Sequence, residues 1–243
     1  MIEVRSLKKS FGAQPVLQDV SFRIENGESV VIIGRSGGGK SVLLKHIIGL
    51  LQPDAGAVLI DSEDIVAMNE RQLLRVRRKF GMVFQGAALF DSMTVAENVA
   101  FGLRRHEHLT EAEIAKRVAA TLDMVDLPGT ENKNPAELSG GMRKRVGLAR
   151  AIIYEPQIVL YDEPTTGLDP IVSDSIDKLI IRVRDHLRVT SIVVTHDMRS
   201  ARRVGNRVLM LHDKKIYANC TPEALFTSQD SVVRQFVDGV ADS

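Results

Sequence analysis

A glycine-rich segment of eight residues, Gly34–Ser41, constrains this chain more than any other part of its sequence. A bound phosphate chain needs several backbone N–H groups that converge on it, and glycine lets the backbone close in without Cβ clashes. The segment follows the apolar, β-branched run Ser29–Ile33 and precedes a predicted helix, Val42–Leu51, whose N-terminal dipole favours an anion. A strand, a glycine-rich loop and a helix in this order predict an α/β fold that binds a nucleotide.

Each residue of this loop has an expected role in binding ATP. Lys40 should reach the β- and γ-phosphates, and the Ser41 hydroxyl should be a ligand of Mg²⁺. The others supply backbone N–H groups and space, so the expected ATP-binding set is Gly34, Arg35, Ser36, Gly37, Gly38, Gly39, Lys40 and Ser41. The alternative is a glycine-rich turn without a ligand, and the position between a strand and a helix argues against it.

The composition narrows the other classes of function. Lys and Arg number 32 and Asp and Glu number 31, so the net charge of +1 gives no electrostatic reason to expect nucleic acid as a partner. The basic stretch Arg71–Lys79 has no interleaved aromatic residues and fits a solvated helix face better than a nucleic-acid surface. The single cysteine, Cys220, allows no intrachain disulfide. No apolar run approaches the roughly 20 residues that span a bilayer, so a role in membrane transport would need a different chain to cross it.

Periodicity divides the chain into two kinds of segment. Strands open it, at Glu3–Leu7 and Val16–Ile24, and strands alternate with helices again after residue 155, which predicts a mainly parallel sheet with an antiparallel β edge at the N-terminus. Between these parts, Thr94 and Thr110 each stand three residues before a glutamate, the capping-box signature of a helix start. We therefore expect one domain over 1–243. It would comprise a nucleotide-binding core in 1–86 and 155–243, an inserted α-helical subdomain in 87–154 and a helical tail in 222–243.

A pair of acidic residues follows the apolar strand that is predicted to end at Tyr161. The carboxyl ends of parallel strands form the edge where α/β sheets bind ligands. Asp162 is placed there to hold the Mg²⁺ shell, and Glu163, one residue beyond, to polarise the attacking water. An apolar run followed by acidic residues can also mark no more than a strand end, and the phosphate-binding loop in the same chain is what favours catalysis.

The segment Leu138–Met142 offers a second helix start that could bind an anion. Ser139 can cap the helix, and Gly140 and Gly141 leave the backbone accessible at its start. The chain has one phosphate loop and one Asp-Glu pair, so a second cradle suggests that another copy of the chain supplies it to the ATP of the first. An ordinary capped helix explains the same five residues.

Three further residues are candidates because of their positions. Gln85 ends a predicted strand, Gly81–Gln85, at the junction with the helical insert, and could sense Mg²⁺ or water; the alternative is a surface glutamine. His196 follows the apolar strand Ser191–Thr195. Phe11 could stack on adenine, although a lone phenylalanine usually belongs to the core.

Taken together, these motifs resemble the ATP-binding subunit of ABC transporters over essentially the whole chain. The Walker A loop, Q-loop, signature, Walker B segment, adjacent glutamate, D-loop and H-loop occur in family order at Gly34–Ser41, Gln85, Leu138–Met142, Val159–Asp162, Glu163, Gly167–Asp169 and His196. The resemblance implies a RecA-like P-loop core, ATP hydrolysis with ATP and Mg²⁺ as cofactors, and a head-to-tail dimer. It assigns catalytic roles to Glu163, His196 and Gln85, a metal set to Ser41, Gln85 and Asp162, and contact with the ATP of the other copy to Ser139, Gly140 and Gly141.

Within that family, three stretches resemble the Mla/Mce branch, the ATPases of phospholipid-trafficking systems. Met142 stands where the common signature has glutamine, and Gly86–Val99 and the tail Val233–Asp242 also look like that branch. The resemblance implies a peripheral protein on the cytoplasmic face of the inner membrane. Its implied partners are an integral membrane permease, a STAS-domain regulatory protein and an Mce-type lipid-binding subunit. The alternatives are the cassette of an amino-acid or other small-solute importer, and a soluble ABC ATPase.

Two apolar segments are candidates for interaction surfaces. In the first, Gln85–Leu103, four apolar residues stand close together; buried, they belong to the core, and exposed, they would mark the permease interface: Ala88, Leu89, Phe90 and Met93. In the second, the tail after Thr221-Pro222, apolar residues recur at three- and four-residue spacing on a segment too short to be a stable helix alone: Val232, Val233, Phe236, Val237 and Val240. The tail must pack either on its own domain, or on a second copy or the STAS-domain partner.

Overall fold

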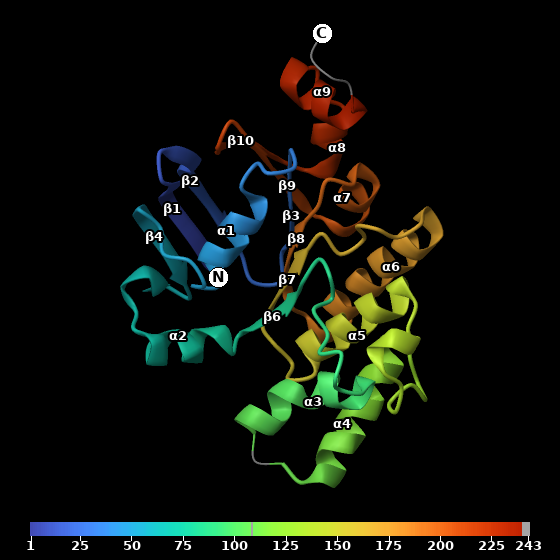
Figure 1. Cartoon of the computed structure of the whole chain (residues 1–243). Helices are drawn as coiled ribbons and strands as arrows, with labels where there is room; N and C mark the ends of the chain where they lie inside the picture. Colours follow the sequence, from blue (N-terminus) through green and yellow to red (C-terminus); the bar gives the residue numbers. More distant parts are fainter. Residues whose placement is uncertain (108, 240–243) are drawn as a thin grey trace. The chain divides into compact units, whose positions relative to one another are not determined.

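The computed structural model describes residues 1–107 and 109–239 (Figure 1). The chain divides into two compact units, the first formed by Met1–Lys79 and Thr190–Ser243 and the second by Phe80–Val189. Within the described residues, every helix is too short or too polar to cross a membrane.

Strands of the first unit pair in two groups. An antiparallel sheet has the order β2-β1-β4-β5, with bounds β1 (Ile2–Phe11), β2 (Gln14–Ile24), β4 (Ala55–Ile60) and β5 (Glu63–Asp64). In the other group β3 pairs in parallel with β8 and β9, and β10 pairs antiparallel with β9; the bounds are β3 (Ser29–Gly34), β8 (Thr190–Val194), β9 (Arg207–His212) and β10 (Lys215–Cys220). All six residues of β3 are buried, as expected for a parallel strand covered on both faces.

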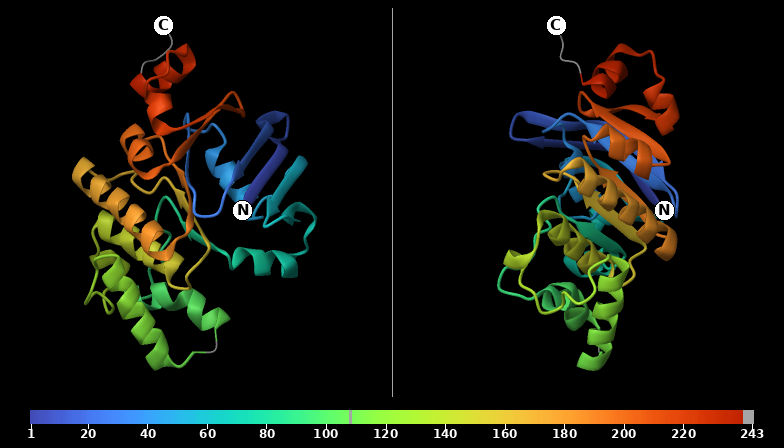
Figure 2. Two further views of the ribbon diagram at one scale, coloured as in Figure 1. Left: turned by 180° about the vertical axis from the view of Figure 1, so that it is seen from behind. Right: turned by 90° about the vertical axis from the view of Figure 1, so that its right-hand side faces the viewer.

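Helices of the first unit connect these strands. They are α1 (Lys40–Ile47), the 3-10 turn η1 (Ile65–Ala67), α2 (Glu70–Arg77), α7 (Met198–Val204), α8 (Pro222–Phe226) and α9 (Ser231–Asp238). Both views in Figure 2 show α8 and α9, in red, beside the orange strands of their own unit, and α8 contacts β9, α7 and α9.

The second unit is mostly helical. Its elements are β6 (Phe80–Val83), α3 (Val95–His106), α4 (Glu111–Met124), the 3-10 turn η2 (Pro135–Glu137), α5 (Gly140–Ile152), β7 (Ile158–Asp162) and α6 (Pro170–Leu187). Strands β6 and β7 pair in parallel, and α5 packs against α3, α4, α6 and β6. The expected mainly parallel sheet, antiparallel N-terminal strands and helical segment are therefore confirmed.

The expected segment boundaries differ from the observed ones where the backbone turns. The helix expected over Val42–Leu51 spans Lys40–Ile47, because Gly49 takes a left-handed φ of 66° two residues after its end. The division between the two compact units falls at residues 79/80 and 189/190, and the expected limits of the helical subdomain at 86/87 and 154/155 stay a prediction. Strands β6 and β7 belong to the second unit because they pair with each other and β6 packs on α5. This packing is so close that a Cβ on Gly81 of β6 would stand 2.3 Å from the Ala151 carbonyl oxygen of α5.

Gln85 does not end a strand as predicted. Strand β6 stops at Val83, and Gln85 lies exposed in the turn that follows. Ala87 and Ala88 have left-handed φ angles of 61° and 50°, which lie outside the range of a regular strand. The two alanines do not indicate this turn, because alanine is not a residue that usually marks one.

Strand β10, which forms a hairpin with β9, was not predicted from the sequence. Strand β10 follows β9 after Asp213 and Lys214, both left-handed with φ of 45° and 69°. Two left-handed central residues are the pattern of a two-residue hairpin, which usually carries Asn-Gly or Asp-Gly instead. Lysine in the second position hides the turn from the sequence.

The tail packs on its own unit. The side chain of Val233 in α9 is buried, whereas Val232, Phe236 and Val237 are half-buried. Asp230 caps α9, and Tyr217 of β10 donates a hydrogen bond of 2.9 Å to its Oδ2. Val240 and the end of the segment Val233–Asp242 lie outside the described residues.

Both predicted capping boxes are present, and the one at Thr94 belongs to a larger hydrogen-bonded knot. The side chain of Asn98, one turn into α3, has no exposed surface. Its Nδ2 donates to the carbonyl oxygens of Phe90, Met93 and Thr94 at 3.0 to 3.1 Å, and its Oδ1 accepts from Phe90 N at 2.8 Å. One amide therefore holds the last part of the loop, from Phe90 to Thr94, that leads into α3.

Replacing Asn98 with alanine should lower the free energy of unfolding by about 2 to 4 kcal/mol, because buried main-chain groups lose their partners. Urea denaturation of the purified protein measures this loss. Asn132→Ala is the matched control, since Asn132 is exposed in the same unit. Equal midpoints for the two variants would contradict the role given to Asn98.

Candidate active site

The glycine-rich loop lies between β3 and α1, and two of its glycines are required by the backbone. A Cβ on Gly34 would stand 2.5 Å from the Leu211 carbonyl oxygen, so no other residue fits there without a shift. Gly39 has a left-handed φ of 97° and is the N-cap residue of α1. The loop is thus built by close packing against β9 and by a turn that glycine favours.

The N-terminus of α1 differs from the N-termini of the other described α-helices because no side chain caps it. Gly39 offers no side-chain acceptor, and the first turn holds no acidic residue. The other described α-helices each have a side chain that accepts a hydrogen bond from the first turn: Asn69, Thr94, Thr110, Ser139, Asp169, Asp197, Thr221 and Asp230. The first N–H groups of a helix need an acceptor, and a phosphate group supplies one. The loop therefore fits ATP.

Lys40 lies at the start of α1 with its side chain curled over the loop. Its Nζ donates to the carbonyl oxygens of Gly34 at 2.8 Å and Arg35 at 3.0 Å, and only 6% of the residue is exposed. The ammonium group is therefore held within the loop that would surround the phosphates. Ser41 follows it, half-buried, in the first turn of α1.

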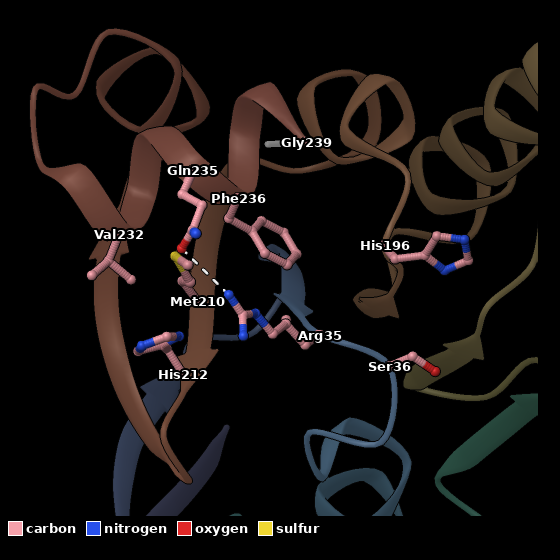
Figure 3. Close-up of a pocket in the computed structure, with 10 residues that line it drawn as sticks. Arg35, Ser36, His196, Met210, His212, Val232, Gln235, Phe236 and Gly239 are labelled. Atoms are coloured by element: carbon pink, nitrogen blue, oxygen red, sulfur yellow. Dashed lines mark hydrogen bonds between the residues drawn. The ribbon is translucent and has the colours of Figure 1, made fainter. Parts of the chain in front are cut away.

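His196 lies with the P-loop in the first unit. Both contribute to the lining of a cavity of about 540 Å³, whose other walls come from β9 and α9 (Figure 3). Figure 3 also shows Gln235 of α9 accepting a hydrogen bond from Arg35, at 3.3 Å. His196, Gly34, Arg35 and Ser36 therefore line one cavity, and the catalytic role of His196 stays a prediction.

Phe11 is the last residue of β1 and is 50% exposed, which excludes the expectation of a core phenylalanine. The Lys9 ammonium lies 5.6 Å from the centre of its ring. An exposed ring remains available for stacking on a base, so the ATP-binding role of Phe11 stays a prediction.

The remaining candidates lie in the second unit, at the carboxyl ends of its two parallel strands. Gln85 follows β6, Asp162 is the last residue of β7, and Glu163 comes directly after it. Glu163 is 8% exposed and has a left-handed φ of 50°, and its Oε2 accepts a hydrogen bond of 3.1 Å from Thr166 Oγ1. Val83 pairs with Tyr161, so the chain leaves both strands at the same edge of the sheet, and the metal role of Asp162 and Gln85 stays a prediction. The complete set with Ser41 spans both units and stays a prediction.

Ser139 forms the ordinary cap that was one of its two interpretations. Its Oγ accepts a hydrogen bond of 3.3 Å from Met142 N, and α5 begins at Gly140. Ser139 and Gly140 are exposed, and Gly141 is half-buried against Val172. The contact with the ATP of a second copy stays a prediction.

One residue of this region was not singled out from the sequence. Lys144 of α5 donates hydrogen bonds to the main-chain oxygens of Gln85 and Glu163. Burial lowers its pKa, against the attraction of the Glu163 and Asp162 carboxylates. The available signal was a lysine on the same helix face as Leu148 and Ala151, where apolar residues are expected.

Comparisons with known proteins agree with this arrangement. The sequence family described as "ABC transporter" matches residues 17–166. The "Probable ribonucleotide transport ATP-binding protein mkl" of Mycobacterium leprae is 45% identical over 238 residues, which cover 98% of this chain and 69% of that protein. The "Intermembrane phospholipid transport system ATP-binding protein MlaF" of Escherichia coli K12 is 39% identical over 242 residues, which cover 100% of this chain and 90% of that protein.

A solved structure is similar as well. It is described as the "Dimeric structure of a post-hydrolysis state of the ATP-binding cassette MJ0796 bound to ADP and Pi". It has a TM-score of 0.84 and 33% identity, and the match covers 91% of this chain and 99% of that one.

Replacing Lys40 with alanine should weaken MgATP binding by about 10- to 100-fold, as expected when hydrogen bonds from a charged group worth about 1.5 to 3 kcal/mol are lost. A calorimetric titration with ATP measures the affinity. Lys45→Ala is the control, because Lys45 lies on the same helix with an exposed side chain. Equal affinities of the two variants would exclude Lys40 as a phosphate ligand.

Proposed function

Because the chain belongs to the ABC transporter family, as one of its ATP-hydrolysing cassettes, we propose that it drives phospholipid trafficking across the cell envelope through a separate permease. The observation that supports the ATPase part is the uncapped N-terminus of α1 behind the glycine loop. The phospholipid part is supported by 39% identity to E. coli MlaF over the whole of this chain, together with Met142 in the signature.

ATP would be held mainly by the first unit. The N–H groups of the loop and of the first turn of α1 would donate to the phosphates, and Lys40 would turn its ammonium from the loop carbonyls to the phosphate oxygens. Phe11 would stack on the adenine.

Hydrolysis would depend on the acidic pair of the second unit. Ser41, Gln85 and Asp162 would hold Mg²⁺, which supplies positive charge to the phosphate oxygens. Glu163 would accept the proton of the attacking water, with its carboxylate fixed by Thr166. His196, beside the P-loop, would contact the γ-phosphate end of the nucleotide.

A second copy of the chain would complete each site. Ser139 and Gly140 are exposed at the start of α5, where a head-to-tail arrangement would bring them, with Gly141, to the γ-phosphate of the other copy. The similar cassette of known structure is described as dimeric. Each dimer would then contain two such sites, and both would close or open together.

The permease would dock on the second unit. Phe84, Phe90 and Phe101 are 39%, 41% and 37% exposed, and the rings of Phe90 and Phe101 lie 4.8 Å apart. Such exposed aromatic residues next to one another are typical of an interaction surface. They lie on the same segment as Gln85, so the docked permease would act directly on the loop that holds a candidate metal ligand.

The other partners follow from the Mla-type resemblance. We place the chain on the cytoplasmic face of the inner membrane as a peripheral subunit, with a STAS-domain regulatory protein and an Mce-type lipid-binding subunit in the same assembly. A transporter of small polar solutes is the second candidate, because the relative from M. leprae is named for ribonucleotide transport and is 45% identical.

Glu163→Gln should reduce kcat for ATP hydrolysis by at least about 100-fold, the lower end of what a general base contributes. Its affinity for ATP should stay near that of the wild type, since the amide keeps the shape of the side chain. The control is Glu155→Gln: Glu155 is an exposed glutamate of the same unit with a similar left-handed φ of 53°. Normal turnover of Glu163→Gln would remove Glu163 from the mechanism.

The same variant tests the dimer. Because it binds ATP and hydrolyses it slowly, Glu163→Gln should sediment as a dimer with ATP and Mg²⁺ and as a monomer without nucleotide. A monomer that hydrolyses ATP at full rate would exclude the shared site.

Purification of the tagged chain from membranes should recover an integral membrane protein together with phospholipid. Phe90→Asp should abolish this recovery while ATP binding persists, because a carboxylate in an apolar interface loses its hydration. Leu74→Asp is the matched control, since Leu74 is 54% exposed in the first unit. A copurified permease that carries nucleotide and no phospholipid would favour the second candidate.

A further inference from the structure

A buried lysine joins two of the motifs described above. Lys144 is the fifth residue of α5, the helix that begins at the signature, and is only 8% exposed. Its Nζ donates to the main-chain oxygen of Gln85 and, at 3.3 Å, to that of Glu163. Both bonds are made to backbone atoms, so they fix the path of the chain and do not engage the two functional side chains.

The position demands a charged donor. Burying an ammonium group costs free energy unless hydrogen bonds and nearby negative charge compensate for it. Two carbonyl oxygens and the carboxylates of Asp162 and Glu163 surround Lys144, and burial nevertheless lowers its pKa. A neutral apolar side chain of the same length would fill the space at lower cost, so the bonds themselves are the reason for a lysine here.

The backbone of Glu163 needs such a support. A glutamate at φ 50° adopts a conformation that costs on the order of 1 kcal/mol or more, and it persists only where neighbouring contacts hold it. Its carbonyl oxygen accepts from Thr166 N at 3.3 Å and from Lys144 Nζ at the same distance. The direction of the Glu163 carboxylate depends on this turn, because the side chain leaves from it.

The loop after β6 is held from the same helix. Arg150, six residues after Lys144 on α5, donates to the carbonyl oxygens of Ala87 and Ala88, both at 2.7 Å. Two cations of one helix therefore bind three carbonyl oxygens of the segment from Gln85 to Ala88. Of the two, only Lys144 also reaches the Glu163 turn among the bonds that the structure describes.

We propose that Lys144 is a positioning residue for ATP hydrolysis, which locks the Glu163 carboxylate in its working direction and ties that turn to the Gln85 loop. This inference rests on the proposed role of Glu163 as the base. Lys144 touches neither ATP nor water in this scheme, and it acts through the two backbones that it joins.

The test is the steady-state kinetics of two Lys144 variants. Lys144→Met, which keeps the length and loses the donors, should lower kcat by about 10-fold or more with KM for ATP unchanged within about twofold. Lys144→Arg, which restores a buried cation with several donors, should recover most of that loss. The matched control, Lys116→Met, changes an exposed lysine of α4 in the same unit and should have normal kinetics.

A double-mutant cycle separates positioning from a general structural effect. If Lys144 acts through Glu163, adding Lys144→Met to Glu163→Gln should change the residual kcat by less than about twofold. The double variant should also still form the dimer with ATP, because the start of α5 is capped by Ser139 and does not depend on Lys144. An equal fall in kcat in both backgrounds, or loss of the dimer, would overturn the proposal.

Two further outcomes are decisive. If Lys144→Met does not fold, Lys144→Gln replaces it, because glutamine keeps an amide donor on a shorter side chain. A normal kcat in the variant that folds would overturn the proposal. The two possible failures can be told apart. If only this inference fails, Glu163→Gln is slow and Lys144→Met has a normal kcat. If the proposed function fails, Glu163→Gln itself turns over at the wild-type rate.

Discussion

The start of α1, which has no side-chain N-cap, is the constraint on which the rest of the first unit depends. A phosphate group can accept from the N–H groups of such a helix start, and here β3 and the glycine loop lead the chain to it. Close packing of Gly34 against Leu211 of β9 keeps the loop in place. The main chain of the loop is thus set by this packing and by the left-handed turn at Gly39.

Helix α5 has the corresponding role in the second unit. Its start carries the exposed Ser139 cap, its first turns carry Lys144, and its end carries Arg150. The same helix therefore presents the signature and holds the backbone of the Gln85 loop and of Glu163. A shift of α5 would reach all three motifs, and this gives a physical basis for coupling between a docked permease and hydrolysis.

Local signals in the sequence were sufficient for the fold and for the strand, loop and helix order of the phosphate-binding segment. The capping boxes at Thr94 and Thr110, the buried run of β3 and the glycine loop depend on neighbouring residues, and the structure has them as predicted. The prediction that Gln85 ends a strand was wrong because two left-handed alanines make a turn there. Arg150 supports that turn from 62 and 63 residues away in the sequence. Helical spacing indicates that Lys144 lies on a face with apolar residues, but it does not identify its partners, because they lie 59 and 19 residues away.

The left-handed backbone at Glu163 also has a consequence for how this protein can evolve. Glycine or asparagine at that position would relieve the strain, so the residue that gives the most stable turn is not the one that can accept a proton. Selection for heat tolerance alone would therefore favour replacing the glutamate, and selection for turnover would oppose it. A stabilised descendant of this chain is expected to gain its stability elsewhere, and to keep an unfavourable turn where the chemistry occurs.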